Sequence, residues 1–255
     1  MSSAANKDLV VTAVTKLFGQ RDTSAVDAYF GPTYTQHSAV AADGLDGLRA
    51  LAANLPAGFR YEPARVLGEG DLVVTHGVYH GFGPEPLVAF DLWRVADGRI
   101  VEHWDALQPQ VATTVSGRSQ VDGPTQVTAP EQTAANRALV ERFVDQVLVR
   151  GDLSELTGYF ADGAYAQHNP QIGDDLSGLG AALQVLAEQG LTMTYTKVHR
   201  VVADGEFVFV QSEGTFGPTP TVFYDLFRVA GGKVAEHWDV VFPVPAELPH
   251  GNGLF

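Results

Sequence analysis

The stretch FDLWRVADGRIVEHWD, residues 90–105, recurs as YDLFRVAGGKVAEHWD, residues 224–239, with ten of the sixteen positions identical. Each copy has the pattern of a β-hairpin, in which a run of Val, Leu and aromatic residues meets a glycine-containing turn and a second such run follows. Ionisable residues lie inside both expected strands of each copy. A sheet that only covered a core would not need them, so the stretch predicts a polar site.

The ionisable residues of the two hairpins match one another in pairs. They are Asp91, Glu102, His103 and Asp105 in the first copy, and Asp225, Glu236, His237 and Asp239 in the second. Successive side chains of a strand point to opposite faces. We therefore expect His103 and Asp105 to share one face of the sheet, and Glu102 and Trp104 to share the other.

The match between the two halves extends well beyond the hairpin. Residues 14–30 align with 144–160, and YTQHS at 34–38 aligns with YAQHN at 165–169. A unit of about 110 to 120 residues is therefore used twice, which predicts two tandem domains. We expect the first domain over residues 1–109, a linker over 110–130 that is rich in Thr, Ser, Gly and Pro, and the second domain over 131–255.

Each unit is expected to contain helices followed by an antiparallel meander of four strands. The periodicity predicts helices near 9–18, 24–30, 43–54, 131–149, 153–160 and 176–189, extended pieces at 34–37 and 165–168, and strands near 60–68, 71–82, 86–96, 99–108, 192–203, 206–216, 219–230 and 233–242. Such a unit is α+β, with one sheet face packed on the helices. Helices and a curled sheet of this kind can enclose a cone-shaped cavity.

Composition narrows the range of partners. The net charge of -14 argues against nucleic acid and anionic membrane surfaces, and the absence of cysteine excludes disulfides and thiolate chemistry. No apolar run approaches the ~20 residues of a membrane helix, and the N-terminus lacks a signal-peptide pattern. We therefore expect a cytoplasmic protein.

The order of elements, the YxQHN/S piece and the EHWD hairpin together resemble the nuclear transport factor 2-like superfamily. The SnoaL-like branch, which includes polyketide cyclases, is the most similar. The resemblance covers both units and implies two cone-shaped units, each with three helices on a curved antiparallel sheet. The superfamily also holds ketosteroid isomerase, scytalone dehydratase, limonene epoxide hydrolase and members without catalytic activity, so the fold alone does not decide the reaction.

The resemblance implies roles for the polar residues of each unit. Asp91 and Asp225 stand where ketosteroid isomerase has a protonated, hydrogen-bond-donating aspartate, and His103 and His237 stand at a position that lines the pocket. The isomerase's general base lies in the extended piece, where this chain has no carboxylate.

A histidine of that extended piece would therefore have to be the base, His37 in one unit and His168 in the other. The ordinary imidazole pKa of about 6.5 suits this role near neutrality. Asp105 and Asp239 would orient the neighbouring imidazole and stabilise its cation. The alternative is that all these polar groups satisfy one another in a partly hydrated pocket.

Further residues are expected to line the two pockets and contact substrate. They are Tyr34, His76 and Trp93 in the first unit, and Tyr165, Asn169, Gln211 and Phe227 in the second. Arg94 and Arg228 follow the strand aspartate by three positions and are expected on the opposite face, which argues against an Asp-Arg-Asp relay. Neither a nucleotide-binding motif nor an established metal spacing is present, so we expect no cofactor and no metal.

The sequence thus predicts a cofactor-independent acid–base enzyme acting on a small or medium apolar carbonyl compound, by aldol cyclisation, isomerisation or dehydration. The alternative is a non-catalytic protein that binds a small molecule in the same pockets. We expect the units to form an intramolecular pseudo-dimer through Trp104 and Trp238, and the chain could assemble further into homo-oligomers. The second unit, with His168-Asn169-Pro170 and a tail that could close over its pocket, is expected to keep the ancestral site.

Overall fold

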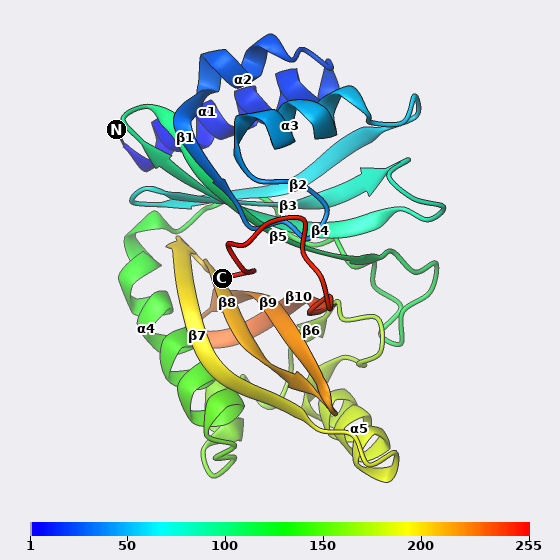
Figure 1. Ribbon diagram of the computed structural model, residues 1–255. Coiled ribbons are helices and arrows are strands. Elements are labelled where there is room, and N and C mark those ends of the chain that lie inside the picture. The colour runs from blue at the N-terminus through cyan, green and yellow to red at the C-terminus, as the bar shows by residue number, and fades with distance from the viewer. Residues whose placement is uncertain (1) are drawn as a thin grey trace. The chain divides into compact units, whose positions relative to one another are not determined.

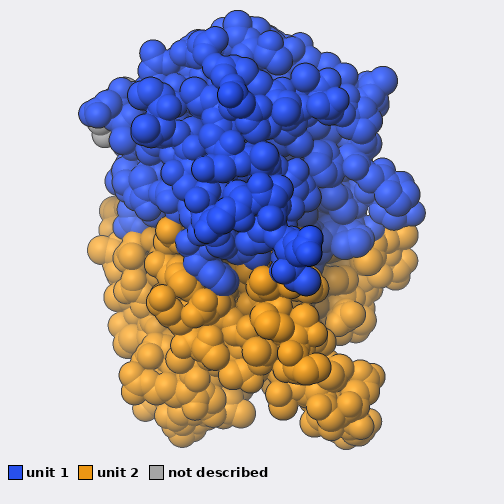
Figure 2. Space-filling view, in the orientation of Figure 1, with its two compact units in different colours: residues 1–110, 245–255 blue, residues 111–244 orange. Residues whose placement is uncertain are grey.

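The computed structural model describes residues 2–255 and divides them into two compact units (Figure 1). Unit 1 consists of residues 1–110 and 245–255, and unit 2 consists of residues 111–244 (Figure 2). Within residues 2–255, none of the helices combines the length and the apolar character that crossing a membrane requires.

Both units follow the same order of elements. Unit 1 contains α1 (Ser3–Val14), the π-helical turn η1 (Thr15–Gly19), α2 (Ser24–Tyr29), β1 (Phe30–Gln36), α3 (Gly44–Ala53), β2 (Arg60–Glu69), β3 (Leu72–His80), β4 (Leu87–Ala96) and β5 (Arg99–Pro109). Unit 2 contains the 3-10 turn η2 (Pro130–Gln132), α4 (Thr133–Phe143), the π-helical turn η3 (Val144–Val149), the 3-10 turn η4 (Leu156–Tyr159), β6 (Ala166–Gln167), α5 (Asp175–Glu188), β7 (Met193–Asp204), β8 (Phe207–Phe216), β9 (Thr219–Ala230) and β10 (Lys233–Pro243). The helix expected near 153–160 is therefore only a short 3-10 turn.

Each sheet has five strands, one more than the four-stranded meander expected from the sequence. The strand order is β1-β5-β4-β3-β2 in unit 1 and β6-β10-β9-β8-β7 in unit 2. The additional strand is the extended piece of the YxQHN/S motif, which pairs in parallel with the last strand of its unit, whereas the other pairings are antiparallel. This pairing holds the residues after β1 and β6 beside the EHWD strand.

The helices close the two units to different extents. In unit 1, α3 buries Leu48 and Ala52 in the same core cluster as Trp93, and Figure 1 shows α1, α2 and α3 on one side of the sheet. In unit 2, the core contains residues of α4, η3, η4 and the sheet, whereas α5 has no buried residue and packs against this core only through partly buried Leu176 and Leu179. Leu183 and Val185 of α5 are 43% and 51% exposed. A helix therefore closes the core of unit 1, and its counterpart in unit 2 stays largely in solvent.

The segments after the two EHWD strands are attached differently from the sequence prediction. Residues 111–130, expected to be a free linker, belong to unit 2, where the Asp122 carbonyl accepts a hydrogen bond of 3.0 Å from Trp238 Nε1. The C-terminal tail, expected over the second pocket, belongs to unit 1, where Asn252 Nδ2 donates to the Gln36 carbonyl over 2.9 Å. The sequence could not reveal which unit holds each segment, because this depends on hydrogen bonds between residues that are far apart in the chain.

One buried asparagine joins the first helix of each unit to its sheet. Asn6 Nδ2 donates to the Gly70 carbonyl and Asn136 Nδ2 to the Gly205 carbonyl, each over 2.9 Å. Gly70 and Gly205 lie in tight turns between strands, with φ angles of 60° and 61°. A buried carbonyl that loses its donor carries the cost of its desolvation.

We expect Asn136→Ala to lower the free energy of unfolding of unit 2 by about 1–3 kcal/mol, because the amide that satisfies Gly205 is removed. Urea unfolding followed by circular dichroism measures this. Gln184→Ala, on the exposed face of α5, is the control and should change stability by less than ~0.5 kcal/mol. Equal stabilities for Asn136→Ala and the control would show that the helix-to-turn bond contributes nothing.

Candidate functional site

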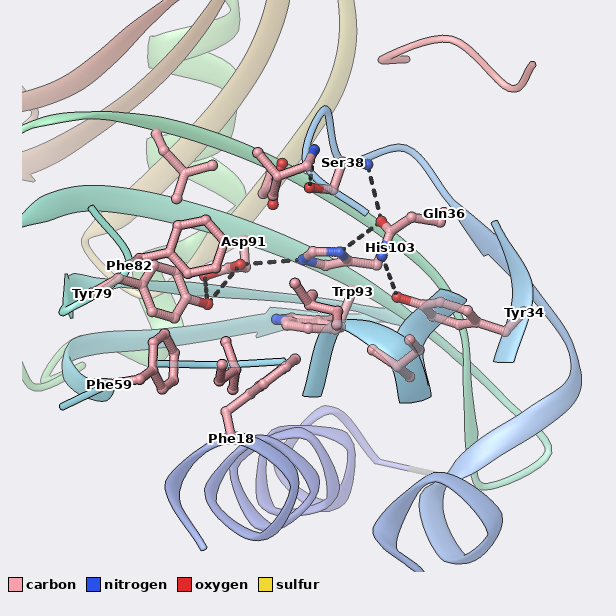
Figure 3. A pocket seen from close by; sticks show the side chains of 16 residues that line it. Phe18, Tyr34, Gln36, Ser38, Phe59, Tyr79, Phe82, Asp91, Trp93 and His103 are labelled. Carbon is pink, nitrogen blue, oxygen red and sulfur yellow. Dashed lines mark hydrogen bonds and ion pairs between the residues drawn. The ribbon is translucent and has the colours of Figure 1, made fainter. Parts of the chain in front are cut away.

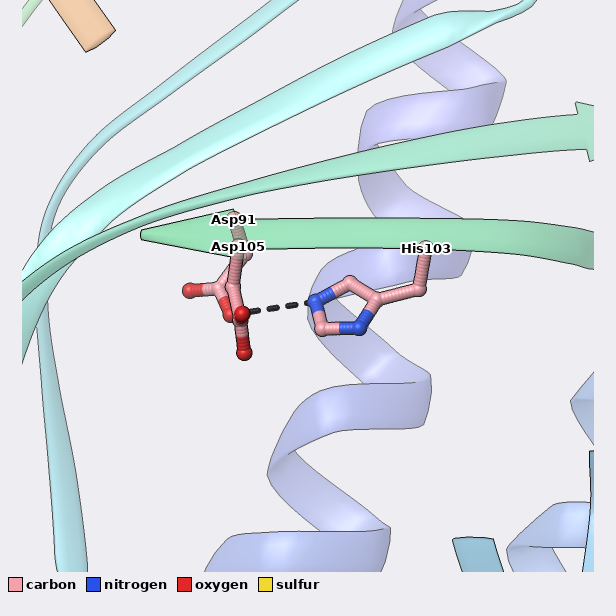
Figure 4. Close-up of side chains that lie close together, drawn as sticks. All are labelled: Asp91, His103 and Asp105. Carbon is pink, nitrogen blue, oxygen red and sulfur yellow. Dashed lines mark hydrogen bonds and ion pairs between the residues drawn. The ribbon is translucent and has the colours of Figure 1, made fainter. Parts of the chain in front are cut away.

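The register of β4 against β5 brings three ionisable side chains together. Asp91 lies directly opposite Asp105 in this antiparallel pair, and His103 lies opposite Trp93. Opposed residues share a face, as do residues two apart, so Asp91, His103 and Asp105 project together. One imidazole nitrogen of His103 and one carboxylate oxygen of each aspartate all lie within 4.8 Å of one another (Figure 4).

Asp91 is the most heavily hydrogen-bonded member of this group. The Tyr79 hydroxyl lies 3.0 and 3.1 Å from its two oxygens, the Thr75 hydroxyl donates over 3.3 Å, and His103 Nε2 lies 3.2 Å from Oδ1. The carboxyl is only 1% exposed. The two hydroxyl donors compensate the buried carboxyl group for the water that it has lost.

His103 is held from both sides of its ring. The Trp93 ring stacks on the imidazole with centroids 3.9 Å apart, and Nδ1 lies 2.9 Å from Gln36 Oε1. The imidazole is therefore fixed in its plane and aimed at Asp91, without depending on a ligand.

These groups form the polar end of an apolar pocket in unit 1 (Figure 3). The empty space among its lining residues, together with open solvent at the mouth, measures about 470 Å³. Val40, which belongs to its lining, is 47% exposed, so the pocket has a solvent-accessible side there. The lining residues are Phe18, Tyr34, Gln36, Ser38, Val40, Leu48, Leu51, Leu55, Phe59, Tyr79, Phe82, Asp91, Trp93, His103, Asp105 and Leu107.

This environment changes the acidity of the carboxyl and phenol groups. Burial, together with the Asp91 carboxylate, raises the pKa of Asp105 to about 6, although the charge of His103 acts in the opposite direction. Burial and nearby carboxylates also raise the pKa of Tyr34 and Tyr79 well above the ordinary phenol value. The phenols thus stay protonated near neutrality, whereas Asp105 can gain or lose a proton there.

Unit 2 repeats the arrangement on β9 and β10. Asp225 lies opposite Asp239, and His237 Nε2 is 3.0 Å from Asp225 Oδ1. Phe227 stacks on His237 with centroids 4.8 Å apart, and Asn169 Nδ2 donates to Asp239 Oδ2 over 2.7 Å. Both expected polar groups therefore form, each within its own unit.

The tyrosine that contacts the strand aspartate comes from a different strand in each unit. In unit 1 it is Tyr79 on β3, whereas in unit 2 it is Tyr195 on β7, whose hydroxyl donates to Asp225 Oδ1 over 3.2 Å. In unit 1, Tyr79 on β3 pairs with Tyr61 on β2. In unit 2, Tyr195 on β7 pairs with Gly214 on β8. A Cβ on Gly214 would fall 1.8 Å from the Thr194 carbonyl oxygen, so no side chain fits there.

The acidity of the second site follows the same causes. Burial and the Asp225 carboxylate raise the pKa of Asp239 to about 6. Burial by itself would lower the pKa of His237, but its hydrogen bond to Asp225 and the charges of Asp239 and Asp225 outweigh burial and raise it. The second site therefore also holds groups that exchange protons near neutral pH.

Each Asp-His-Asp group also has the donor chemistry of a metal site. One imidazole and two carboxylates within 4.8 Å could hold a divalent cation. However, each histidine has both ring nitrogens within hydrogen-bond distance of a protein oxygen, at 2.9 and 3.2 Å for His103. A metal ion could bind the histidine only by displacing one of these contacts. Whether the protein depends on a metal is therefore tested by chelation.

The prediction that His37 and His168 are pocket bases is wrong in its geometry, because both lie on the opposite face of the sheet. His37 stacks on Trp104, with Nε2 3.1 Å from Glu102 Oε1 and Nδ1 3.0 Å from the Gly253 carbonyl. His168 stacks on Trp238 and bonds Glu236 Oε1 over 2.8 Å. All the ring nitrogens of the two histidines are engaged, since His168 Nδ1 lies 2.6 Å from the Ser119 carbonyl.

His76 and Gln211 also lie on the face away from the pocket, contrary to the sequence prediction. Thr75 pairs with Asp91, so its neighbour His76 points the other way, where it stacks on Phe90 with centroids 4.1 Å apart. Gln211 bonds the Tyr224 hydroxyl over 2.8 Å on the corresponding face of unit 2. The face on which His76 lies depends on the register of β3 with β4, which the sequence does not give.

The remaining predicted residues lie at or near the two polar groups. Tyr34 and Trp93 line the pocket of unit 1, whereas Tyr165 is within 3.3 Å of the Gln167 amide in unit 2. Arg94 lies on the opposite face, as expected, where its Nε donates to Glu102 over 2.8 Å.

The sequence analysis missed Gln36 and Gln167, although both belong to the repeated YxQHN/S motif. It also missed Thr75, Tyr79 and Tyr195. The two tyrosines are not at equivalent positions of the repeat, so comparing the halves could not reveal them. The sequence signal that could have indicated the glutamines is that Gln36 and Gln167 are identical in the two copies of the motif.

Comparison with protein families gives two matches to the model of the SnoaL-like domain, over residues 11–103 and 140–237. Solved structures similar to one unit include TsrD from Streptomyces laurentii, at 18% identity, a TM-score of 0.37, and coverage of 42% of this chain and 91% of TsrD. A putative ketosteroid isomerase from Kribbella flavida matches at 16% identity and a TM-score of 0.39, covering 49% and 92% of the two chains. IdmH, a putative polyketide cyclase from Streptomyces antibioticus, matches at 20% identity and a TM-score of 0.34, covering 40% of this chain and 91% of IdmH. No curated protein sequence matches the chain, and structural similarities of this size carry no argument about activity.

The raised pKa of Asp105 predicts a pH-dependent stability. A carboxyl whose pKa rises from 3.8 to about 6 on folding favours the folded state fully below pH ~4, and that contribution is lost as pH rises through 6. We expect Asp105→Asn to stabilise unit 1 at pH 8 by on the order of 3 kcal/mol relative to the unmodified protein, and to have little effect at pH 4. Urea unfolding at both pH values measures this, and equal effects at the two would contradict it.

Proposed function

Because this chain belongs to the SnoaL-like family, with one copy of the domain in each unit, we propose that it is an acid–base enzyme acting on a compact, largely apolar carbonyl compound. The reaction class is formation of an enol or enolate at the carbon beside the carbonyl. Aldol cyclisation, isomerisation and dehydration all begin in this way. The proposal requires neither a redox cofactor nor a nucleotide.

The observation that carries this proposal is the position of Asp105. Its carboxyl is 9% exposed, shares a pocket with aromatic side chains, and has a pKa raised to about 6. A carboxylate that has lost its hydration is a stronger base than one in water, and a pKa near the working pH is favourable for proton transfer. We assign Asp105 as the general base that removes the α-proton.

The Asp91–His103 pair is the proposed acid. A proton shared across the 3.2 Å between Asp91 Oδ1 and His103 Nε2 is available to the carbonyl oxygen as charge develops there. The electron pair of the broken C–H bond moves into the enol, Asp105 keeps the α-proton, and the carbonyl oxygen receives the proton of the pair. In isomerisation, Asp105 returns its proton to another carbon while the enol oxygen gives its proton back to the pair and becomes a carbonyl again. In the aldol branch, the enol carbon attacks a second carbonyl, whose oxygen takes the proton held by Asp105, and the enol oxygen again returns its proton to the pair.

The alternative is a binding protein that holds an apolar ligand without changing it. Such a protein would gain nothing from Asp105, since a buried carboxyl with a raised pKa destabilises the folded state above pH ~6. The aromatic walls alone would bind the ligand. The arrangement of the polar end therefore favours catalysis.

The test is exchange of α-protons with solvent, which needs no knowledge of the natural substrate. A panel of small aryl ketones, cyclic ketones and 1,3-diketones in D₂O is followed by proton NMR. We expect the protein to accelerate exchange of at least one class, before and after exhaustive chelation. The double variant Asp105→Asn/Asp239→Asn should lower the rate by about 10²–10⁴ because both bases are removed.

Asp97→Asn is the matched control, since it makes the same chemical change at the exposed turn of the first hairpin. Its exchange rate should equal that of the unmodified protein. Absence of any accelerated exchange, or full exchange in the double variant, would overturn the proposal. Loss of exchange on chelation, with recovery on adding a divalent cation, would replace it with a metal-dependent reaction.

The two sites are expected to contribute unequally. The sequence alone favoured unit 2, but the apolar pocket described above lies in unit 1, where α3 has buried core residues, whereas α5 of unit 2 has none. We therefore expect Asp105→Asn alone to remove most of the exchange activity, and Asp239→Asn alone to remove little. Equal losses would indicate two equivalent sites, and a loss confined to Asp239→Asn would restore the expectation from the sequence.

A further inference from the structure

The same glutamine stands at the end of β1 and of β6, and its amide can be oriented in only one way. Gln36 Oε1 accepts the backbone N–H of His37 over 3.0 Å and that of Ser38 over 2.9 Å. Backbone N–H groups only donate, so the oxygen must face them. The Nε2 end then donates to the Tyr34 hydroxyl over 3.0 Å.

This orientation determines which nitrogen of His103 carries a proton. His103 Nδ1 lies 2.9 Å from the same Gln36 oxygen. An amide oxygen has no proton to give, so a hydrogen bond exists only if Nδ1 carries one. In the neutral ring, Nε2 then has the free lone pair, and Nε2 is the nitrogen that faces Asp91 Oδ1.

We propose that Gln36 and Gln167 are positioning residues that fix the neutral imidazole of His103 and His237 in the Nδ1–H tautomer, so that Nε2 can take and return the proton of the neighbouring aspartate. The inference rests on the proposed function for its catalytic meaning, whereas the tautomer itself is a property of the resting protein. Neither glutamine touches the groups assigned to the reaction except through the histidine.

Unit 2 supports the inference independently. Gln167 Oε1 accepts the backbone N–H groups of His168 and Asn169, each over 2.9 Å, and lies 3.1 Å from His237 Nδ1. Its Nε2 donates to the Tyr165 hydroxyl over 3.3 Å. Around these glutamine hydrogen bonds the two units differ. Asn169 stands where unit 1 has Ser38, and the tyrosine that bonds the aspartate comes from a different strand. The glutamine bonds, like the Asp–His contact, are kept in both units.

The tautomer matters because it sets the direction in which a proton can move. With Nδ1–H donated to glutamine, the proton of Asp91 passes to Nε2 along one hydrogen bond and returns along the same line. In the opposite tautomer, Nε2 would already carry a proton and the Nδ1 lone pair would face the Gln36 oxygen lone pairs. Asp105, Tyr79 and Tyr34 are the other titratable groups that line this pocket, and the hydrogen bond of Nδ1 is to Gln36.

Nitrogen-15 NMR of uniformly labelled full-length protein tests this directly, since long-range proton–nitrogen spectra distinguish the two tautomers of a neutral histidine. The His103 and His237 signals are assigned by their loss in His103→Gln and His237→Gln. We expect both rings to show Nδ1–H when neutral. A ring that is Nε2–H, or doubly protonated up to pH 9, overturns the inference without any variant of glutamine.

Two substitutions of Gln36 sharpen the test, with His237 in the same sample as the internal control. Gln36→Glu keeps an acceptor at Nδ1 and should keep the tautomer, whereas Gln36→Leu removes the acceptor and should shift His103 towards Nε2–H. His237 should be unchanged in both variants. Retention of Nδ1–H by His103 in Gln36→Leu would show that glutamine does not fix it, and if Gln36→Leu fails to fold, the unmodified protein and Gln36→Glu still decide.

The rate of α-proton exchange is a second readout. We expect Gln36→Leu to lower the unit 1 rate about 10- to 100-fold, as removal of an orienting partner typically does, and Gln36→Glu to keep more of it and to shift its pH profile. A confirmed tautomer without any exchange activity would refute the proposed function alone. Full activity of Gln36→Leu despite a changed tautomer would refute the positioning role alone.

Discussion

Placement of Asp91 directly opposite Asp105 on neighbouring antiparallel strands is the constraint on which the rest of the site depends. Two carboxyls held on one face of a buried sheet repel one another when both are ionised, and each also loses hydration. The Thr75 and Tyr79 hydroxyls donate to Asp91, and the pKa of Asp105 is raised. One residue type thus lies in two different environments, and the proposed division into a base and an acid depends on this difference.

The same sheet separates two kinds of histidine. On the pocket face, His103 has its ring against Trp93 and its Nε2 towards Asp91. On the other face, His37 lies against Trp104 with its nitrogens towards Glu102 and the C-terminal tail. Alternation along the strand keeps the two apart, so the proposed proton transfer and the attachment of the tail depend on separate sets of residues.

Unit 2 shows which parts of this arrangement tolerate change. The tyrosine that bonds the aspartate comes from β7 in place of β3, and the partner of the second aspartate is Asn169. The Asp–His contact and the glutamine bonds recur. The helix that covers the core in unit 1 is largely exposed in unit 2. The polar end is thus retained in both units, and the apolar walls that would select a substrate differ.

The sequence by itself determined the duplication, the α+β class and the sharing of one face by His103 and Asp105, because repeats, hydrophobic periodicity and strand alternation are local properties. It also showed the glutamine of the YxQHN/S motif without revealing its purpose. Only the tertiary structure decided that β1 joins the sheet beside β5, which turns His37 away from the pocket and brings Gln36 to His103. Register between strands likewise decided that Tyr79 reaches Asp91 and that His76 does not. These outcomes depend on pairing between residues far apart in the chain, which no local pattern records.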